Sequence, residues 1–362
     1  MALEPRPHPT LLSVVIPCYN EEAVLPLLRE RLIAFFEALP GRAEAVFVND
    51  GSRDRTLEML LAWSRDDPRI KVVSLASNFG HQIAVTAGLD YAAGDAVVIM
   101  DADLQDPPEV VLQMIDRYCA GYDVVYGKRV ERAGESGFKL FTAWVFYRLM
   151  RRLVHRDLPA DAGDFRLVSR RALDAIRAMR EQHRFLRGMF AWIGFPQTAV
   201  EYKRAERAAG ETKYPLRKML RLALIAALSF GPSPLRLVFV IAALVALFAV
   251  GYTAYTVLLP LMGVAAVPGW SSQIVLTCLI GASVLFGIGM VGEYVARIYE
   301  EVKGRPLYLV ARSANIEAGV LPPGPADKPQ ASTEIENKPR GPRPPPETPG
   351  ARRFTDYREG VV

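Results

Sequence analysis

The sequence predicts an α/β protein with a mostly parallel, doubly wound sheet, followed by two membrane helices and a disordered tail. Three observations support this prediction. In the first part of the chain, short β-branched runs alternate with apolar residues at helical spacing. A run of 56 residues from Leu237 to Gly292 then contains no Lys, Arg, Asp, Glu or His. Finally, ten prolines lie between Pro322 and Pro349, among small and charged residues that cannot build a core.

Apolar runs that stop at polar, turn-forming residues predict the strands of the sheet. A βαβ alternation makes consecutive strands parallel, so their carboxyl ends share the edge at which open α/β sheets bind ligands. The strands are expected within Ser13–Glu22 and Ala45–Ser52, over Ile70–Leu75 and Val97–Met100, and later over Val124–Tyr126. The helices are expected over Ala23–Leu39, Asp54–Ser64 and Gly80–Ala93.

The segment VVIMDADLQDPPE, Val97–Glu109, places Asp101 and Asp103 directly after a buried strand. Two carboxylates at this spacing suit Mg²⁺ or Mn²⁺, which proteins usually bind through one or two carboxylates plus substrate phosphates. Taken alone, the motif fits a solvated acidic turn equally well. The choice between the two depends on the surrounding sequence.

Two segments predict helices that lie at a membrane surface. Residues 138–153 and 215–230 combine aromatic and aliphatic side chains with Lys and Arg, a pattern typical of interfacial helices. An internal helix with a basic end remains the alternative for the first segment. If both are interfacial, they bring the catalytic edge of the sheet to the depth of the lipid headgroups.

Two membrane-spanning helices are predicted at residues 235–259 and 272–292. Twenty-three apolar or weakly polar residues form a helix of about 34 Å, which exceeds a hydrocarbon core of about 30 Å. The connecting loop is uncharged, whereas basic residues lie on both flanks, so both flanks are expected to be cytoplasmic. A buried hairpin of a soluble protein is the alternative. The flanking basic residues are Arg217, Lys218, Arg221 and Arg236 before the pair, and Arg297, Lys303 and Arg305 after it.

The remaining features limit the class of protein. The sequence GIGMVG at Gly287–Gly292 matches a dinucleotide fingerprint formally, but it follows no strand and opens no amphipathic helix. Ser283 and Gly287 instead predict close approach of the two membrane helices. Three scattered cysteines exclude a disulfide or zinc framework, and the net charge of +5 comes with no nucleic-acid-binding motif. Residues 1–10 form a proline-rich extension without a signal peptide, 293–312 a cytoplasmic juxtamembrane segment, and 313–362 the disordered tail.

Five motifs in order resemble the family 2 glycosyltransferases of the GT-A, Rossmann-like fold, and more closely their polyprenyl-phosphate type, which includes dolichol-phosphate-mannose synthases and bactoprenol glucosyltransferases. The resemblance covers Leu11 to Val310. One departure is Asn49 before Asp50, where many relatives have two aspartates. The motifs are PCYNE (Pro17–Glu21), NDGS (Asn49–Ser52), SNFGHQ (Ser77–Gln82), DADLQDPPE (Asp101–Glu109) and GDFRL (Gly163–Leu167).

The resemblance assigns roles to individual residues. Asp103 and Gln105 are implied as the metal ligands for Mg²⁺ or Mn²⁺, and Asp103 and Asp164 as the catalytic pair. Asp164 corresponds to a base or an acceptor-orienting carboxylate. We favour orientation, because a phosphomonoester with a second pKa near 6 is already nucleophilic at neutral pH. The donor-binding residues are expected to be Pro17, Tyr19, Glu21, Val48, Asp50, Asp101, Ala102 and Asp103. The residues expected to bind the acceptor phosphate are Arg129, Arg132, Ser136, Arg207 and Lys213.

The expected function is inverting transfer of one hexose from a nucleotide sugar to polyprenyl phosphate at the cytoplasmic leaflet of the inner (plasma) membrane. UDP-glucose is the favoured donor, because Gly134–Lys139 and the SNFGH segment resemble bactoprenol glucosyltransferases more than mannose synthases. Mannose, another hexose or an amino sugar remains an alternative. A processive synthase is disfavoured, because the chain lacks a Q-x-x-R-W motif. A non-catalytic membrane scaffold is the alternative from another class, and a homo-oligomer stays open.

Overall fold

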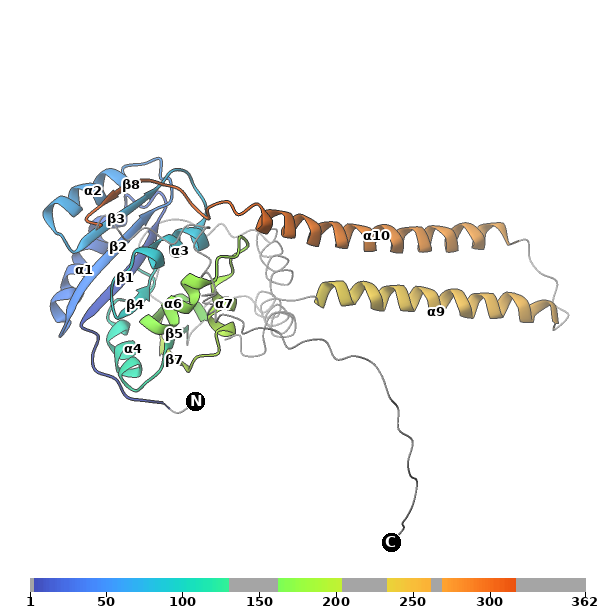
Figure 1. Cartoon of the computed structure of the whole chain (residues 1–362), viewed down its shortest axis with the longest axis horizontal. Coiled ribbons are helices and arrows are strands. Elements are labelled where there is room, and N and C mark those ends of the chain that lie inside the picture. The colour runs from blue at the N-terminus through green and yellow to red at the C-terminus, as the bar shows by residue number, and fades with distance from the viewer. Residues whose placement is uncertain (1–2, 130–161, 204–232, 262–268, 317–362) are drawn as a thin grey trace, which may run out of the picture. The chain divides into compact units, whose positions relative to one another are not determined.

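The computed structural model describes residues 3–129, 162–203, 233–261 and 269–316. Within them, one mixed sheet has the strand order β7-β5-β6-β4-β1-β2-β3-β8 (Figure 1). The predicted α/β class with a mostly parallel sheet is therefore confirmed. The strands are β1 (Leu11–Cys18), β2 (Arg42–Asn49), β3 (Ile70–Leu75), β4 (Ala96–Ile99), β5 (Val124–Arg129), β6 (Ala162–Ser169), β7 (Gln197–Tyr202) and β8 (Val310–Ala314).

The centre of the sheet is parallel, as the alternating pattern predicts. Strand β1 pairs in parallel with β2 on one side and with β4 on the other, and β2 pairs in parallel with β3. Strand β6 runs antiparallel between β4 and β5. As a result, the start of β6 lies at the same edge of the sheet as the ends of β1, β2 and β4.

Helices cover both faces of the sheet (Figure 1). Their apolar sides form two cores, one on each face. Gly88 allows α3 to pack directly on the sheet, since a Cβ at this position would collide with Val15 of β1. The first face carries α1 (Leu25–Ala38), α2 (Thr56–Asp66) and α4 (Val110–Cys119), and the second carries α3 (His81–Tyr91), α6 (Arg170–Ala178) and α7 (Leu186–Trp192).

The chain returns to the sheet after its apolar helices, which the sequence did not lead us to expect. Strand β8 pairs antiparallel with β3, and Asn315 Nδ2 donates to the carbonyls of Ser64 and Ile70. Tyr308 is buried, and its hydroxyl donates to Asp90 at 2.8 Å. Placing the start of the disordered tail at residue 313 was therefore wrong, because residues 313 and 314 belong to β8.

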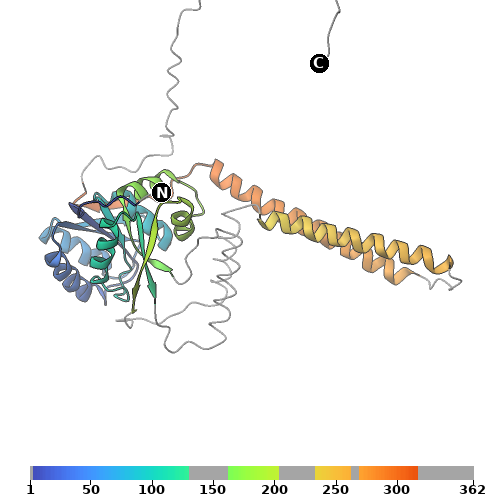
Figure 2. The same ribbon diagram turned by 90° about the horizontal axis from the view of Figure 1, so that it is seen from below.

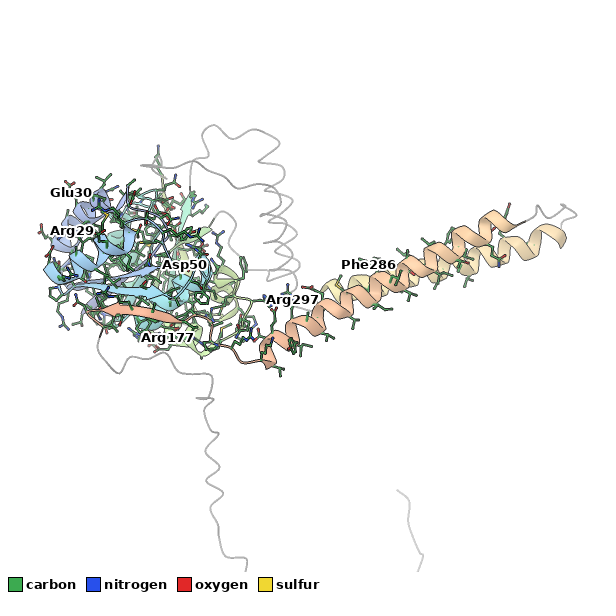
Figure 3. All side chains as sticks on the ribbon, turned by 90° about the horizontal axis from the view of Figure 1, so that it is seen from above. Arg29, Glu30, Asp50, Arg177, Phe286 and Arg297 are labelled. Carbon is green, nitrogen blue, oxygen red and sulfur yellow. The ribbon has the colours of Figure 1, made fainter. Side chains whose placement is uncertain are left out.

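Two long apolar helices follow the α/β domain, α9 (Ser233–Leu261) and α10 (Trp270–Val302), and they lie side by side (Figures 1 and 2). A Cβ at Gly287 would lie 3.5 Å from Val238 of α9, in line with the small residues expected at this interface. Among the described residues, Leu279–Val302 is long and apolar enough to cross a membrane, whereas the apolar part of α9, Val240–Tyr252, is shorter. Phe286 lies exposed on α10 (Figure 3). The expected interfacial helices at 138–153 and 215–230 lie outside the described residues.

Candidate active site

The candidate site lies at the carboxyl edge of the parallel strands, where the loops after β1, β2 and β4 lie beside the start of β6. The loop after β1 contributes Tyr19, the loop after β2 contributes Asp50, and the turn after β4 contributes Asp101 and Asp103. Asp164 lies near the start of β6, which is antiparallel to β4. Strand direction therefore gathers residues that are more than 140 positions apart in the chain.

The loops after β1 and β2 are held together by hydrogen bonds. Asn20 has a positive φ of 56°. Its side chain accepts from the amide of Arg53 at 2.8 Å, and its own amide donates to Ser52 Oγ at 3.0 Å. Beside this turn the Tyr19 side chain is 44% exposed. An exposed aromatic ring on a braced turn provides the kind of face on which a nucleotide base stacks.

Asp50 has a structural role in addition to any role in donor binding. The side chain is buried, and its two oxygens accept from the amides of Phe79 at 2.7 Å and Gly80 at 2.9 Å. Burial raises the pKa of this carboxyl, although the two amides act in the opposite direction. Asp50 therefore anchors the SNFGH segment to the end of β2 and sets the start of α3. Figure 3 labels this residue.

The turn after β4 brings the two expected metal ligands together. The amide of Gln105 donates to Asp103 Oδ1 at 3.1 Å, and Leu104 between them has a positive φ of 58°. Asp106 is buried instead and accepts from the Tyr202 hydroxyl at 2.5 Å. Within the described ranges, no group of three or more His, Cys, Asp or Glu side chains could hold a metal. Asp103 and Gln105 alone fit a cation that takes its remaining ligands from a diphosphate.

A charge network joins Asp101 to Asp164 through His81. The Nε2 of His81 lies 3.3 Å from Asp164 Oδ2 and 3.8 Å from Asp101 Oδ1. Arg187 of α7 binds Asp164 with two nitrogens, Nε to Oδ1 at 2.8 Å and Nη2 to Oδ2 at 3.1 Å. The start of α3, the turn after β4, strand β6 and helix α7 therefore meet at one point.

The pKa shifts in this network follow from burial and from the opposite charges. Burial opposes ionisation of Asp164, but the charge of Arg187 and the contact with His81 hold the pKa of this carboxyl well below its usual range. Burial would lower the pKa of His81, but the two carboxylates raise it to about 9. Burial raises the pKa of Asp101 to about 6. At neutral pH, Asp164 is therefore a carboxylate and His81 an imidazolium.

Arg129, a residue expected to bind the acceptor phosphate, lies against Gly163, the residue before Asp164. A Cβ at Gly163 would lie 2.9 Å from Arg129 Nη2, so the glycine makes room for the guanidinium. The buried Nε of Arg129 has no hydrogen-bond partner among the described residues. Burial would lower the pKa of this guanidinium, but Tyr202 and Asp106 raise it.

Some of the expected donor-binding side chains are buried and cannot contact a ligand. Pro17, Val48 and Ala102 are buried, so at these positions only the backbone can contact a donor.

His81 and Arg187 were not among the expected site residues. His81 belongs to the SNFGHQ motif, which was a usable signal, whereas nothing in the sequence around Arg187 marks it. Four expected acceptor-binding residues, Arg132, Ser136, Arg207 and Lys213, lie outside the described residues.

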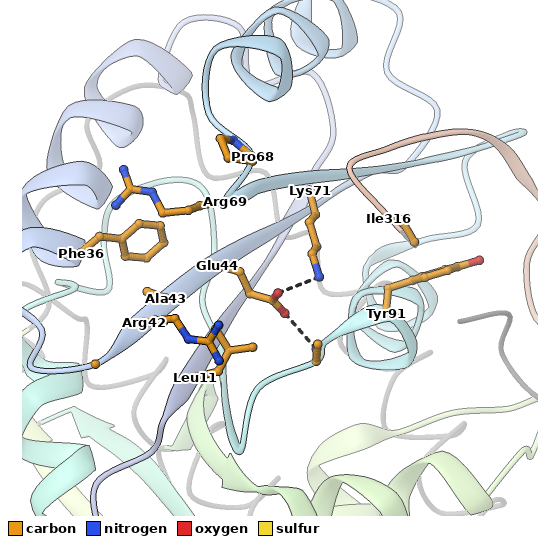
Figure 4. Close-up of a pocket in the computed structure, with 12 residues that line it drawn as sticks. Leu11, Phe36, Arg42, Ala43, Glu44, Pro68, Arg69, Lys71, Tyr91 and Ile316 are labelled. Atoms are coloured by element: carbon orange, nitrogen blue, oxygen red, sulfur yellow. Dashed lines mark hydrogen bonds and ion pairs between the residues drawn. The ribbon is translucent and has the colours of Figure 1, made fainter. Parts of the chain in front are cut away.

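A cavity of about 530 Å³ lies at the opposite edge of the sheet (Figure 4). It is lined by the starts of strands β1, β2 and β3, together with Phe36 and Tyr91. Glu44 in its wall accepts from the Ala93 amide at 2.9 Å and lies 2.7 Å from Lys71 Nζ. Ligands of open α/β sheets bind at the carboxyl ends of the strands, so this cavity is not the candidate active site.

The fold and the carboxyl-edge site are those of an α/β protein that binds its ligand at the ends of parallel strands. The chain belongs to the family 2 glycosyltransferases. The profile "Glycosyl transferase family 2" matches residues 13–177. The "Uncharacterized glycosyltransferase YkcC" of Bacillus subtilis (strain 168) is 47% identical over 84% of this chain and 94% of its own length. The expected family is confirmed.

A second relative carries a more specific name. The "SfII prophage-derived bactoprenol glucosyl transferase" of Shigella flexneri is 39% identical over 83% of this chain and 98% of its own length. Among solved structures, glucosyl-3-phosphoglycerate synthase from Mycobacterium tuberculosis, in complex with Mn²⁺ and UDP, covers 59% of this chain and 76% of its own. At 19% identity and a TM-score of 0.40, it carries no argument about the site.

Proposed function

We propose that the protein transfers a single hexose, with glucose favoured, from a nucleotide-diphosphate sugar to polyprenyl phosphate, with inversion at the anomeric carbon. The observation that carries this proposal is the meeting of Asp101, Asp103 and Asp164 at the carboxyl edge. The identity of 39% to a bactoprenol glucosyl transferase over nearly the whole of that relative supports the acceptor and the sugar.

Asp103 and Gln105 would hold the divalent cation, Mg²⁺ or Mn²⁺. Asp103 would supply a carboxylate and Gln105 a side-chain amide oxygen, both ligand types that these ions accept. Bound there, the cation supplies positive charge to the leaving diphosphate. Tyr19 offers a stacking face for the base, and the buried strand ends set the depth at which the nucleotide lies.

The acceptor supplies the nucleophile. An oxygen of the lipid phosphate attacks the anomeric carbon as the bond from that carbon to the β-phosphate oxygen breaks, and the nucleoside diphosphate leaves with the electron pair. Because the phosphate is ionised at neutral pH, no strong base is needed. Asp164, held ionised by Arg187 and His81, is a weak base and is suited to orienting the reactants. Arg129, Arg132, Ser136, Arg207 and Lys213 would bind the acceptor phosphate.

We place the active edge at the cytoplasmic face of a membrane crossed by both α9 and α10. The length and composition of Leu279–Val302 and the charge-free stretch from Leu237 support this topology. A reporter fused after Ile316, beyond β8, should give a cytoplasmic signal. A periplasmic signal would mean that only one helix crosses.

Purified protein assayed with radiolabelled UDP-glucose and polyprenyl phosphate in detergent tests the proposal. We expect label in the organic phase, with release of UDP. UDP-galactose, UDP-N-acetylglucosamine and GDP-mannose, tested in parallel, determine the sugar. Absence of transfer from every donor would favour a non-catalytic membrane scaffold.

A further inference from the structure

We propose that His81 and Arg187 are positioning residues of the transfer reaction, which together fix the orientation of the Asp164 carboxylate relative to Asp101. This inference rests on the proposed function. The family resemblance assigned no role to either of these two side chains. Both residues act on the reaction through Asp164.

The first support is the geometry around Asp164. A carboxylate on a short side chain can still rotate about two bonds. The Arg187 guanidinium contacts one oxygen with Nε and the other with Nη2, which fixes the plane of the carboxylate. His81 contacts Oδ2 from a different element. Three contacts from two separate elements leave the group one orientation.

The second support is that α7 also contacts the residue that holds the backbone of the same strand. The buried Arg166 guanidinium donates to the Gly163 carbonyl at 2.9 Å and stacks on Phe190, with Cζ 4.6 Å from the ring centroid. Phe190 lies on α7, as does Arg187. Helix α7 therefore braces both the backbone and the side chain of the GDF segment, and only Arg187 does so through the carboxylate.

The third support is a matched pair outside the site. The Arg187 and Asp164 side chains are 33% and 12% exposed, and those of Arg180 and Asp90 are 30% and 1% exposed. Both arginines contact both oxygens of an aspartate, but only the Asp164 carboxylate is also contacted by His81, which lies 3.8 Å from Asp101. The two pairs therefore allow a positioning role to be separated from a role in stability by experiment.

Orientation matters because displacing a reacting group by about 1 Å can reduce the rate by roughly a hundredfold. If Arg187 and His81 act by positioning, changing them should lower kcat and leave the KM for UDP-glucose nearly unchanged. We expect Arg187→Lys, which keeps the charge but loses the two-nitrogen contact, to lower kcat about tenfold or more. His81→Gln should lower kcat by a smaller factor.

The chain supplies matched controls. Arg180 also contacts both oxygens of an aspartate, Asp90, at 2.9 and 2.8 Å, so Arg180→Lys makes the same chemical change elsewhere. His183 Nε2 lies 2.6 Å from Glu300 Oε2, so His183→Gln matches His81→Gln. Both controls should keep kcat within about twofold. Melting temperatures of all four variants separate loss of fold from loss of rate.

Chemical rescue keeps the inference testable if the lysine variant folds poorly. Guanidinium ion added to Arg187→Ala should restore part of kcat, which a purely structural role would not allow. Transfer by the wild type together with an unchanged kcat in Arg187→Lys, or with no rescue of Arg187→Ala, overturns the inference. Absence of transfer by the wild type overturns the proposed function instead.

Discussion

The two edges of the sheet satisfy their charges in different ways. At the amino edge, Glu44 accepts from Ser13 Oγ at 2.6 Å and from the Ala93 amide, and it pairs with Lys71 beside a cavity of about 530 Å³. At the carboxyl edge, Asp101 remains partly exposed and lies 3.8 Å from His81. The direction of the strands, rather than the volume of a cavity, therefore indicates which edge carries the candidate active site.

The comparison of the two edges predicts that substitution of Asp103 causes the largest loss of transfer rate. Asp103→Ala removes a ligand of the cation that neutralises the leaving diphosphate, so we expect transfer to fall by about a thousandfold or more. EDTA in excess should stop the wild type equally, and added Mg²⁺ or Mn²⁺ should restore it. Asp66→Ala, at an exposed pair with Arg29, serves as the control. Full activity in EDTA would contradict the metal role.

The second largest loss of rate is expected for Asp164→Asn, which distinguishes an orienting carboxylate from a general base. Asp164→Asn keeps the shape of the side chain but cannot accept a proton. If the lipid phosphate is the nucleophile, we expect kcat to fall by roughly ten- to a hundredfold, with the acidic limb of the pH profile unshifted. Complete loss of transfer, with normal binding of both substrates, would identify a general base and refute orientation.

Substitution of Arg207 tests the proposed binding of the acceptor phosphate. Loss of one charge-assisted contact costs about 2 kcal/mol, so Arg207→Ala should lower kcat/KM for the lipid roughly thirtyfold. The KM for UDP-glucose should change little. The wild-type rate should also fall below about pH 6, where the phosphate takes up its second proton and loses charge. Equal weakening of donor and acceptor would assign Arg207 to the nucleotide instead.

The sequence predicted the part of the site that depends on neighbouring residues in the chain. A β-branched run followed by DAD places Asp101 and Asp103 at a strand end, independently of the more distant residues. The parallel order of the central strands followed from the βαβ alternation in the same way. The first feature depends on adjacent residues, and the parallel β1–β2 and β2–β3 pairs join strands that follow one another in the chain.

The rest of the site depends on contacts that no local pattern specifies. His81 and Asp164 lie 3.3 Å apart although 83 positions separate them, because β6 inserts antiparallel beside β4. Strand β8 escaped prediction because VARSA is short and largely exposed, and it gains its partner β3 only after the chain has passed through α9 and α10. The amides of Phe79 and Gly80 meet Asp50 through a loop conformation that residue types alone do not specify.

Substitution at the amino edge should lower the free energy of unfolding rather than kcat. Glu44 is buried and fully paired, so Glu44→Gln leaves Lys71 without its counter-charge and weakens the bond to Ser13. We expect the free energy of unfolding to fall by about 1 to 3 kcal/mol. The kcat measured below the melting temperature should stay unchanged. A fall in kcat with unaltered melting would mean that the amino edge takes part in transfer.

The smallest effect on transfer is expected from deleting residues 321–362, and a longer truncation that also removes β8 serves as the comparison. Deleting residues 321–362 removes a segment whose composition cannot form a core, so transfer kinetics should stay within about twofold. Deleting from Val310 also removes β8 and the hydrogen bonds of Asn315 at the edge of β3. This longer truncation should lower the melting temperature and expose the edge of β3, with a lower yield of unaggregated protein in detergent. Equal behaviour of the two truncations would show that β8 adds nothing to the sheet, whereas a large loss of transfer in the shorter one would show that the tail acts on the catalytic domain.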